Sequence, residues 1–351
     1  MTAAERPASS DVSTPSRSPR VAVVVPAYRV RDQILGVLEG IGPEVDRIFV
    51  VDDACPEDSG DFVRAECGDS RVTVIRREQN GGVGAAVKTG YRAALADGCD
   101  IVVKVDGDGQ MDPSLIPRFV RPIIAGNADY TKGNRFFNPE DIRGMPGSRL
   151  FGNAVLSFMT KASTGYWQLF DPTNGYTAIG AAALRLIPLD KVADRYFYET
   201  DFLFRLATIR AVVRDVPMAA FYGSETSGLR IRSIIVPFTM GHLRAFFKRI
   251  MYAYFLRSFS VASLELLLAL PLLLFGFVYG LTTWASAASQ GLAATSGQVM
   301  IASLPIIVGV QLLLSFVQYD IASTPSEPLI AYLDDEDGST TRGDDPPAID
   351  G

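Results

Sequence analysis

Two long apolar runs near the C-terminus most constrain what this chain can fold into. The first covers residues 259–284 and carries one charged side chain, Glu265, and the second covers residues 297–319 and carries none. About 20 residues of α-helix cross the hydrocarbon core of a bilayer. A buried helical hairpin in a soluble core is the alternative, but both runs exceed the usual length of a core helix. The runs therefore predict a two-helix transmembrane hairpin over residues 259–320.

The segment before the first run, residues 230–258, combines basic and aromatic side chains. It predicts amphipathic juxtamembrane helices at a membrane interface, where cations face lipid headgroups, with a solvated helix face as the alternative. Because Lys and Arg gather N-terminal to the first run, the positive-inside rule predicts a multi-pass protein of the cell membrane with a cytoplasmic N-terminal domain. The basic residues are Arg230, Arg232, Arg244, Lys248, Arg249 and Arg257.

The composition of the two ends predicts disorder. Residues 1–20 are rich in Ser, Pro, Ala and Arg and lack an apolar core, so a disordered leader is expected rather than a signal peptide. Residues 321–351 form an acidic tail that is also expected to be disordered. The net charge of −6 argues against a nucleic-acid partner, because nucleic-acid binders usually carry a basic balance.

Cysteine and histidine usage argues against several kinds of site. The three cysteines form no CxxC pair, so neither a disulfide framework nor a structural zinc site is expected. The single histidine, His242, gives no basis for a His-rich metal site or a Ser-His-Asp triad. We expect His242 to be a packing residue.

Between the ends, apolar β-branched runs alternate with helical patterns. The expected strands cover residues 21–25, 47–51, 72–75 and 101–105, and the expected helices cover residues 30–40, 84–96, 148–163 and 181–187. This alternation predicts a mostly parallel α/β sheet, in which ligands bind beyond the carboxyl ends of the strands. The side chains at or just beyond those ends are Pro26, Asp52, Asp53, Asp106 and Asp108.

The segment Asp106-Gly107-Asp108 is the sharpest chemical signal. Two carboxylates two residues apart at a strand end can bind one hard divalent cation, which prefers oxygen ligands and often bridges to substrate phosphates. The glycine allows the backbone to approach a ligand closely. A solvated turn is the alternative for this motif taken alone.

Two other segments carry weaker signals. Asp52-Asp53 follows a strand and could accept hydrogen bonds from a base or a ribose, with turn or helix capping as the alternative. Residues 80–84, Asn-Gly-Gly-Val-Gly, resemble a phosphate-cradling loop but match neither the Walker A sequence nor the dinucleotide fingerprint. Helix entry explains their glycines almost as well.

The order of these segments, Val23 to Tyr28, then 51–53, 80–82 and 106–110, resembles family 2 glycosyltransferases with the GT-A fold. Segments 133–136, 149–153 and 171–176 are similar to those of polyprenyl-phosphate glycosyltransferases, of which dolichyl-phosphate mannose synthase is the best known. The resemblance implies a Rossmann-like, mostly parallel catalytic domain over residues 21–229. The C-terminal hairpin resembles that of bacterial members.

The resemblance implies an inverting transfer of a sugar from a UDP- or GDP-sugar to a polyprenyl phosphate of undecaprenyl or dolichyl type. Mg²⁺ or Mn²⁺ is the implied cofactor, the lipid bilayer is an expected partner, and paired hairpins would allow a homo-oligomer. Two alternatives remain: a polysaccharide-elongating relative, although no Gln-x-x-Arg-Trp segment occurs here, and a non-catalytic membrane-tethered nucleotide-binding protein.

Residue roles follow from the same resemblance. Asp106 and Asp108 would hold the metal, Gln110 would face the sugar or acceptor, Arg135 would contact the acceptor phosphate, and Asp171 would be an active-site carboxylate. Glu199 and Asp201 loosely match an acidic segment of the family. The donor would lie against Pro26, Tyr28, Asp52, Asp53, Gly82, Lys88, Asp106 and Gly107.

One departure from the family pattern concerns Thr177, where the family often has arginine. A phosphate contact would then come from elsewhere, and Lys132 and Arg149 are the candidates. Asp53 is also followed by Ala54-Cys55-Pro56 instead of the frequent Gly-Ser pair, so that loop is expected to differ.

Overall fold

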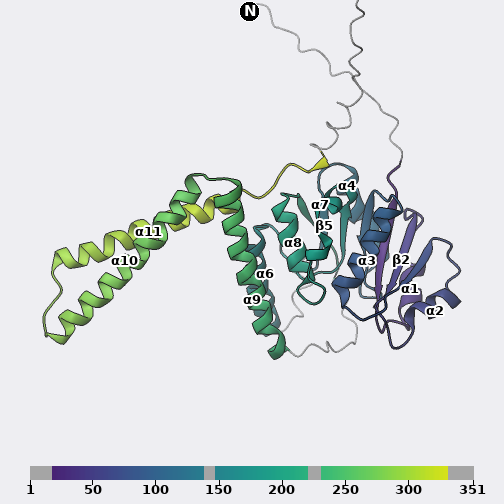
Figure 1. Ribbon diagram of the computed structural model, residues 1–351, viewed down its shortest axis with the longest axis horizontal. Helices are drawn as coiled ribbons and strands as arrows, with labels where there is room; N and C mark the ends of the chain where they lie inside the picture. The colour runs from purple at the N-terminus through teal and green to yellow at the C-terminus, as the bar shows by residue number, and fades with distance from the viewer. Residues whose placement is uncertain (1–17, 138–146, 220–230, 331–351) are drawn as a thin grey trace, which may run out of the picture.

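The computed structural model describes residues 18–137, 147–219 and 231–330 (Figure 1). Most of the predicted leader and acidic tail lie outside these ranges. Within them, the chain forms an α/β domain and a long C-terminal helical hairpin that projects from one side of it.

The described strands form one sheet in the order β3-β2-β1-β4-β6-β5-β7. All neighbouring strands pair in parallel except β6, which is antiparallel to both β4 and β5. The predicted mostly parallel sheet is therefore confirmed. The strands are β1 (Val21–Ala27), β2 (Arg47–Asp52), β3 (Val72–Arg76), β4 (Ile101–Lys104), β5 (Tyr130–Asn134), β6 (Thr177–Gly180) and β7 (Val213–Pro217).

Strand β1 shows why the sheet is buried on both faces. Ala22 and Val24 belong to one apolar core, and Val21, Val23 and Val25 belong to the other. A central parallel strand needs apolar side chains in both directions, which explains the continuous β-branched run. The helices of the domain are α1 (Ile34–Glu39), α2 (Ser59–Glu66), α3 (Val83–Ala96), α4 (Ile116–Ile124), α6 (Gly147–Thr164), α7 (Ala181–Leu186) and α8 (Tyr198–Thr208), with short 3₁₀ turns at Pro113–Leu115 and Leu189–Lys191.

The strands β5, β6 and β7 and the helices α2, α4 and α8 were not expected from the sequence. Strand β5 contains Lys132 and Asn134, and β7 contains Asp215. Polar residues in such short strands hide the apolar pattern that marks a strand; here Lys132 and Asn134 are buried and Asp215 is half-buried.

Helix α9 (Ile231–Ile250) packs along α6 and continues into a π-helical turn, Met251–Arg257 (Figure 1). His242 of α9 is buried, with Nδ1 2.9 Å from the Ser163 hydroxyl and its ring edge-on to Phe197. Burial lowers the pKa of His242 to about 4. His242 is thus the packing residue expected from its sequence context.

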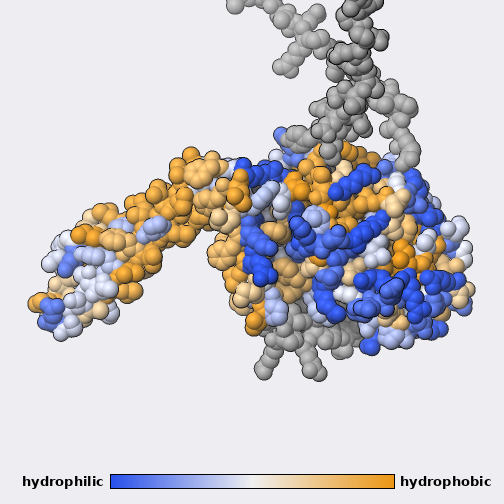
Figure 2. Space-filling model, viewed as in Figure 1, coloured by the Kyte–Doolittle hydropathy of each residue, from blue (hydrophilic) through white to orange (hydrophobic). Residues whose placement is uncertain are grey.

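Helices α10 (Val261–Ser289) and α11 (Ser296–Ala322) form the hairpin, and by length and composition both could cross a bilayer. Hydrophobic residues cover most of their surface in Figure 2. Small residues bring the helices together: a Cβ on Gly276 would lie 2.8 Å from the Ala302 carbonyl oxygen. Within the hairpin, the Ser315 hydroxyl donates to Glu265 at 2.6 Å.

One buried ion pair fastens this hairpin to the domain. Asp320, in the last turn of α11, accepts hydrogen bonds from Arg249 (2.6 and 3.0 Å), Trp167 Nε1 (2.8 Å) and the Tyr254 hydroxyl (2.5 Å). Arg249 also donates to the Ala162 carbonyl of α6 at 2.8 and 3.1 Å. The cluster therefore joins α11, α9 and α6 at one point.

We expect Asp320→Ala to lower the midpoint of thermal unfolding in detergent. Removing one partner of a buried ion pair costs about 3–5 kcal/mol, because the other charge stays buried and unpaired. For a chain of 351 residues such a loss corresponds to roughly 4–7 °C. Arg92→Gln is the control, because it breaks the exposed pair between Arg92 and Asp190 and should change the midpoint little. Similar small shifts in both variants would contradict the structural role of Asp320.

Candidate active site

A cavity of about 420 Å³ opens at the carboxyl ends of β1, β2 and β4. We call it the acidic cleft. This is the edge at which parallel sheets bind ligands. Seven of the residues singled out in the sequence line it: Pro26, Tyr28, Asp53, Gly82, Asp106, Gly107 and Asp108.

Asp53 organises one wall of the acidic cleft. Its buried carboxylate accepts from the backbone amides of Gly81 (3.0 Å) and Gly82 (2.7 Å) and pairs with Arg77. The Asn80 side chain donates to the Asp53 carbonyl at 3.1 Å. A carboxylate has roughly four acceptor positions, so Asp53 can hold this loop and still accept from a ligand.

The glycines of that loop are required by a close approach of another segment. Gly82 has φ +94°, and a Cβ on it would lie 3.0 Å from the Asp194 carbonyl. A Cβ on Gly84 would lie 2.5 Å from the Ala193 carbonyl. This contact brings Arg195 and Tyr196 to the rim of the acidic cleft. No local sequence pattern marks these two residues, because they enter from a distant loop.

The carboxylates of Asp106 and Asp108 lie in the acidic cleft directly after β4. Lys104 Nζ is 2.7 Å from Asp106 Oδ1, and this buried lysine was missed although it interrupts an otherwise apolar strand. This ion pair holds the Asp106 carboxylate beside the buried ammonium group. Gly107 has no room for a side chain, since a Cβ would lie 3.2 Å from the Pro26 carbonyl oxygen.

These carboxylates fit a divalent cation. Two carboxylates, which supply hard oxygen donors, face a cavity that has room for a diphosphate. Within the described part of the chain, no group of three or more His, Cys, Asp or Glu residues could hold a metal ion. Most of the coordination would therefore come from a ligand and water, as Mg²⁺ commonly arranges.

Two predicted donor-binding residues lie outside the acidic cleft. The Asp52 carboxylate is buried and accepts from the backbone amides of Cys55 and Gly60, both at 2.7 Å, so it has the capping role that was the alternative. Lys88 donates to the Val192 carbonyl at 2.8 Å and does not line the cleft. Gln110 is exposed, and the described contact is its backbone amide to Asp108 at 3.0 Å.

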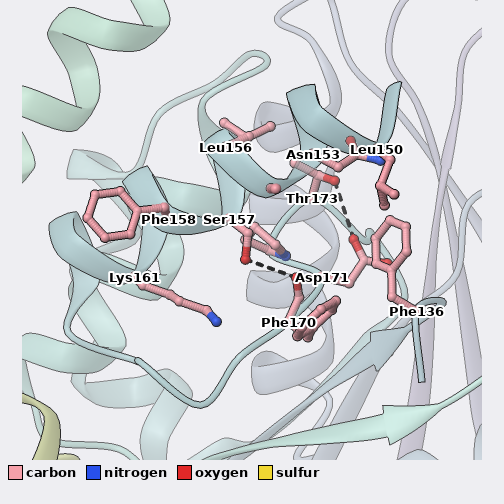
Figure 3. Close-up of a pocket in the computed structure, with 12 residues that line it drawn as sticks. Phe136, Leu150, Asn153, Leu156, Ser157, Phe158, Lys161, Phe170, Asp171 and Thr173 are labelled. Atoms are coloured by element: carbon pink, nitrogen blue, oxygen red, sulfur yellow. Dashed lines mark hydrogen bonds between the residues drawn. The ribbon is translucent and has the colours of Figure 1, made fainter. Parts of the chain in front are cut away.

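A second cavity of about 230 Å³ lies between α6 and the segment after it, and we call it the aromatic groove (Figure 3). Its lining is mostly apolar, with exposed rings at Phe158 and Phe170. Lys161 supplies a cation 5.4 Å from the centre of the Phe170 ring. The remaining lining residues are Phe136, Leu150, Asn153, Ala154, Leu156, Ser157, Asp171, Pro172 and Thr173.

Asp171, at one end of the aromatic groove, pairs with Arg135, which lies next to Phe136 of the groove wall. Arg135 Nε donates to Asp171 Oδ2 at 2.7 Å, and its Nη2 donates to Oδ1 at 3.0 Å. Asp171 is fully buried, whereas the Arg135 side chain is about one-third exposed. A bidentate pair of this kind fixes the guanidinium plane. Asp171 therefore holds the Arg135 side chain in a fixed orientation.

The acidic cleft and the aromatic groove meet through the loop of residues 171–176. A Cβ on Gly175 would lie 2.7 Å from Asp106 Oδ2 and 2.5 Å from Lys104 Nζ. Asp171, at the start of the loop, lines the groove. The Asp106 carboxylate and the partner of Arg135 thus lie at two ends of one short segment.

Buried charged side chains lie next to the loop 171–176. Lys132 is fully buried and donates to the Asn174 carbonyl, so it lines neither cavity, contrary to its sequence-based role as a phosphate contact. Burial lowers the pKa of Lys132 to about 8. Burial raises the pKa of the half-buried Glu199, and the charges of Lys104 and Lys132 oppose that rise. Asp201, the other residue of that acidic segment, pairs instead with Arg205.

The remaining candidate for a phosphate contact is Arg149, in the first turn of α6. The structure does not describe its side chain.

Comparison with known proteins identifies the family. The profile of "Glycosyl transferase family 2" matches residues 22–187. Undecaprenyl-phosphate mannosyltransferase of Micrococcus luteus is 32% identical over 204 residues, which cover 57% of this chain and 82% of that protein. UDP-N-acetylglucosamine–dolichyl-phosphate N-acetylglucosaminyltransferase of Methanococcus voltae is 28% identical, covering 62% of this chain and 92% of that protein.

The chain is also similar in fold to a solved structure, that of glucosyl-3-phosphoglycerate synthase from Mycobacterium tuberculosis with Mn²⁺, UDP-glucose and phosphoglyceric acid. The TM-score is 0.49 at 21% sequence identity, and the match covers 66% of this chain and 79% of that one. The profile match and the relatives agree with the ordered motifs and with the sheet that carries them. The chain therefore belongs to glycosyl transferase family 2 and is a glycosyltransferase.

Proposed function

We propose that this enzyme transfers a sugar, with inversion, from a nucleotide-diphosphate sugar to a polyprenyl phosphate at the cytoplasmic face of the cell membrane. The observation that carries the proposal is the junction of the two cavities. The loop 171–176 connects an acidic cleft suited to a metal-bound diphosphate with an apolar groove that is lined by Asp171, the partner of Arg135. The relatives from M. luteus and M. voltae are named for such transfers to lipid phosphates.

The donor would occupy the acidic cleft. Pro26, Tyr28 and Asp53 offer a surface for the base and ribose, because Tyr28 is exposed and Asp53 retains acceptor capacity. Asp106 and Asp108 would hold Mg²⁺ or Mn²⁺ next to the diphosphate. The bound cation would neutralise charge on the departing nucleoside diphosphate. Gln110 would approach the sugar from the exposed turn after Asp108.

The acceptor would occupy the aromatic groove. Its exposed rings and leucines suit an isoprenoid chain, and Arg135 and Lys161 suit a phosphate. A phosphate monoester has a second pKa near 6, so at neutral pH it is already largely an anionic nucleophile. A strong general base is then unnecessary, which agrees with the engagement of Asp171 by Arg135.

The reaction balances without a proton acceptor. An oxygen of the lipid phosphate forms a bond to the anomeric carbon, while the bond from that carbon to the donor diphosphate breaks on the opposite face. The nucleoside diphosphate leaves with the electron pair. The residues of the site would contribute through positioning and charge stabilisation, with Arg135 holding the attacking phosphate and Lys104 fixing Asp106.

The hairpin would place the domain at the membrane. We propose that α10 and α11 cross the bilayer and that the basic side chains of α9 lie at the cytoplasmic headgroups. Arg249 and Asp320 would then set the position of α6, and with it the aromatic groove, relative to the membrane. Contacts between hairpins of two copies would give the homo-oligomer expected from the sequence.

The proposal is tested by incubating membranes that contain the full-length protein with labelled nucleotide sugars, with and without Mg²⁺ and polyprenyl phosphate. Formation of a sugar-labelled lipid that requires all three components is the expected result. A long glycan would favour polysaccharide elongation instead. No product from any UDP- or GDP-sugar would favour a non-catalytic nucleotide-binding protein.

We expect Asp108→Asn to reduce kcat by at least about 100-fold, since it removes charge from a group that stabilises the leaving diphosphate. The fold should persist, as judged by an unchanged unfolding midpoint. Asp112→Asn is the matched control, because Asp112 caps a nearby turn through Ser114 (2.9 Å) without lining the acidic cleft. Wild-type turnover by Asp108→Asn in saturating Mg²⁺ would remove the metal role.

Arg135→Lys should raise the KM for polyprenyl phosphate about tenfold and leave the KM for the donor unchanged. Lysine keeps the charge, so Asp171 is not left buried without a counter-ion, but it loses the planar bidentate geometry. The exposed Arg118→Lys on α4 is the control. Equal changes in both KM values would place Arg135 outside the acceptor site.

Gly175→Ala should lower kcat about tenfold or more, because its Cβ would push against Lys104 and Asp106 and displace the metal ligands from their reactive geometry. Gly36→Ala in α1 is the control, because no atom lies within 4 Å of its Cβ. If both variants retained wild-type kcat, the loop would not couple the two cavities.

A further inference from the structure

A third cavity, of about 80 Å³, lies where the domain meets the hairpin. One water molecule occupies roughly 30 Å³ in the liquid, so this cavity has the scale of a small oxyanion. It shares no lining residue with the acidic cleft or the aromatic groove. Its polar lining consists of Thr208, Arg210, Arg249, Tyr252, Arg257 and Ser258, which we call the arginine pocket.

The arginine pocket carries excess positive charge. Arg249 is neutralised by Asp320, at 2.6 and 3.0 Å. Arg257 donates to the Thr208 carbonyl at 2.9 Å, which uses one of its five N–H donors. Among the described residues, no acidic side chain lies within ion-pair distance of Arg210 or Arg257. Two exposed guanidinium groups therefore face one small cavity without a counter-ion from the described chain.

The two arginines come from different parts of the molecule. Arg210 follows α8 of the catalytic domain and has φ +60°, a left-handed conformation that a non-glycine residue rarely adopts. Arg257 ends the π-helical turn that leads into α10. An anion between them would bridge the domain and the hairpin.

The surroundings of the arginine pocket point to a lipid as the source of that anion. Only residues 258–260 separate Arg257 from α10. The side chains around this junction are apolar and exposed: Leu256 (76%), Phe259 (63%) and Val261 (71%). If α10 crosses the bilayer as proposed above, the pocket lies at the depth of the headgroups, where basic pockets recognise anionic lipids.

We infer that the arginine pocket binds the phosphate of an anionic glycerophospholipid. Arg210 and Arg257 supply the charge, and the hydroxyls of Tyr252, Thr208 and Ser258 supply neutral donors. This inference rests on the membrane placement in the proposed function. It assigns the lipid a structural role, separate from the acceptor lipid, in holding the catalytic domain against the hairpin.

The test measures binding of phosphatidylglycerol to the full-length protein in detergent by native mass spectrometry. Arg210→Gln combined with Arg257→Gln should weaken binding on the order of 10- to 30-fold, from about 1 kcal/mol per arginine at an anionic surface. The matched control is Arg244→Gln combined with Lys248→Gln, which removes the same charge from exposed positions of α9 outside the three cavities. This control should retain phosphatidylglycerol.

Equal weakening in both double variants would overturn the inference, because it would indicate general surface charge. Equal binding of phosphatidylcholine would overturn the choice of an anionic lipid, and displacement of phosphatidylglycerol by millimolar inorganic phosphate would indicate a site for soluble phosphate. Transfer to a short-chain polyprenyl phosphate in detergent is measured in parallel. Wild-type protein that transfers the sugar but does not bind phosphatidylglycerol would overturn this site alone, whereas wild-type protein that binds phosphatidylglycerol but transfers no sugar would contradict the proposed function alone.

Discussion

The contact between Arg249 and Asp320 is the constraint on which the arrangement of the molecule depends. Asp320 ends a helix apolar enough to cross a membrane, and its partners come from three segments of the domain. A buried ion pair is weak as a source of stability but strict in geometry, since both charges need satisfied partners. Here the partners include a carbonyl of α6, the helix that lines the aromatic groove. If the groove binds the lipid acceptor as proposed, this contact would fix the position of the acceptor site relative to the hairpin.

The second constraint is the close approach of backbone segments around the acidic cleft. Gly82 and Gly84 allow the segment 193–195 to approach, Gly107 allows β1 to approach, and Gly175 allows the Asp106 carboxylate to approach. Each glycine allows a loop from another part of the chain to reach the same edge of the sheet. Lys104 and Asp106 form their ion pair beneath this edge. The site is therefore assembled by packing, and the acidic motif alone would not create it.

Much of the framework was predictable from local patterns. Strands β1, β2 and β4 were expected because apolar residues point to both faces of a central parallel strand, and the helices of the hairpin were expected from uninterrupted apolar length. Strands β5 and β7 escaped notice, because Lys132, Asn134 and Asp215 break the apolar pattern. Those side chains are buried or half-buried through contacts with distant segments, as when Asn134 donates to Asp215 at 2.9 Å. No local pattern reports such a pairing.

The sequence by itself determined the class of sheet, the strand ends that carry Asp53, Asp106 and Asp108, and the apolar hairpin, because these depend on the periodicity and length of contiguous segments. Tertiary structure alone decided which neighbouring aspartate turns into the cleft. Asp53 lines it, whereas Asp52, on the opposite face of the same strand end, caps a buried turn. It also paired Arg135 with Asp171 and Arg249 with Asp320, across separations of 36 and 71 residues. Such pairs form where the packed sheet and helices bring distant charges together. The sequence of either segment alone does not predict that geometry.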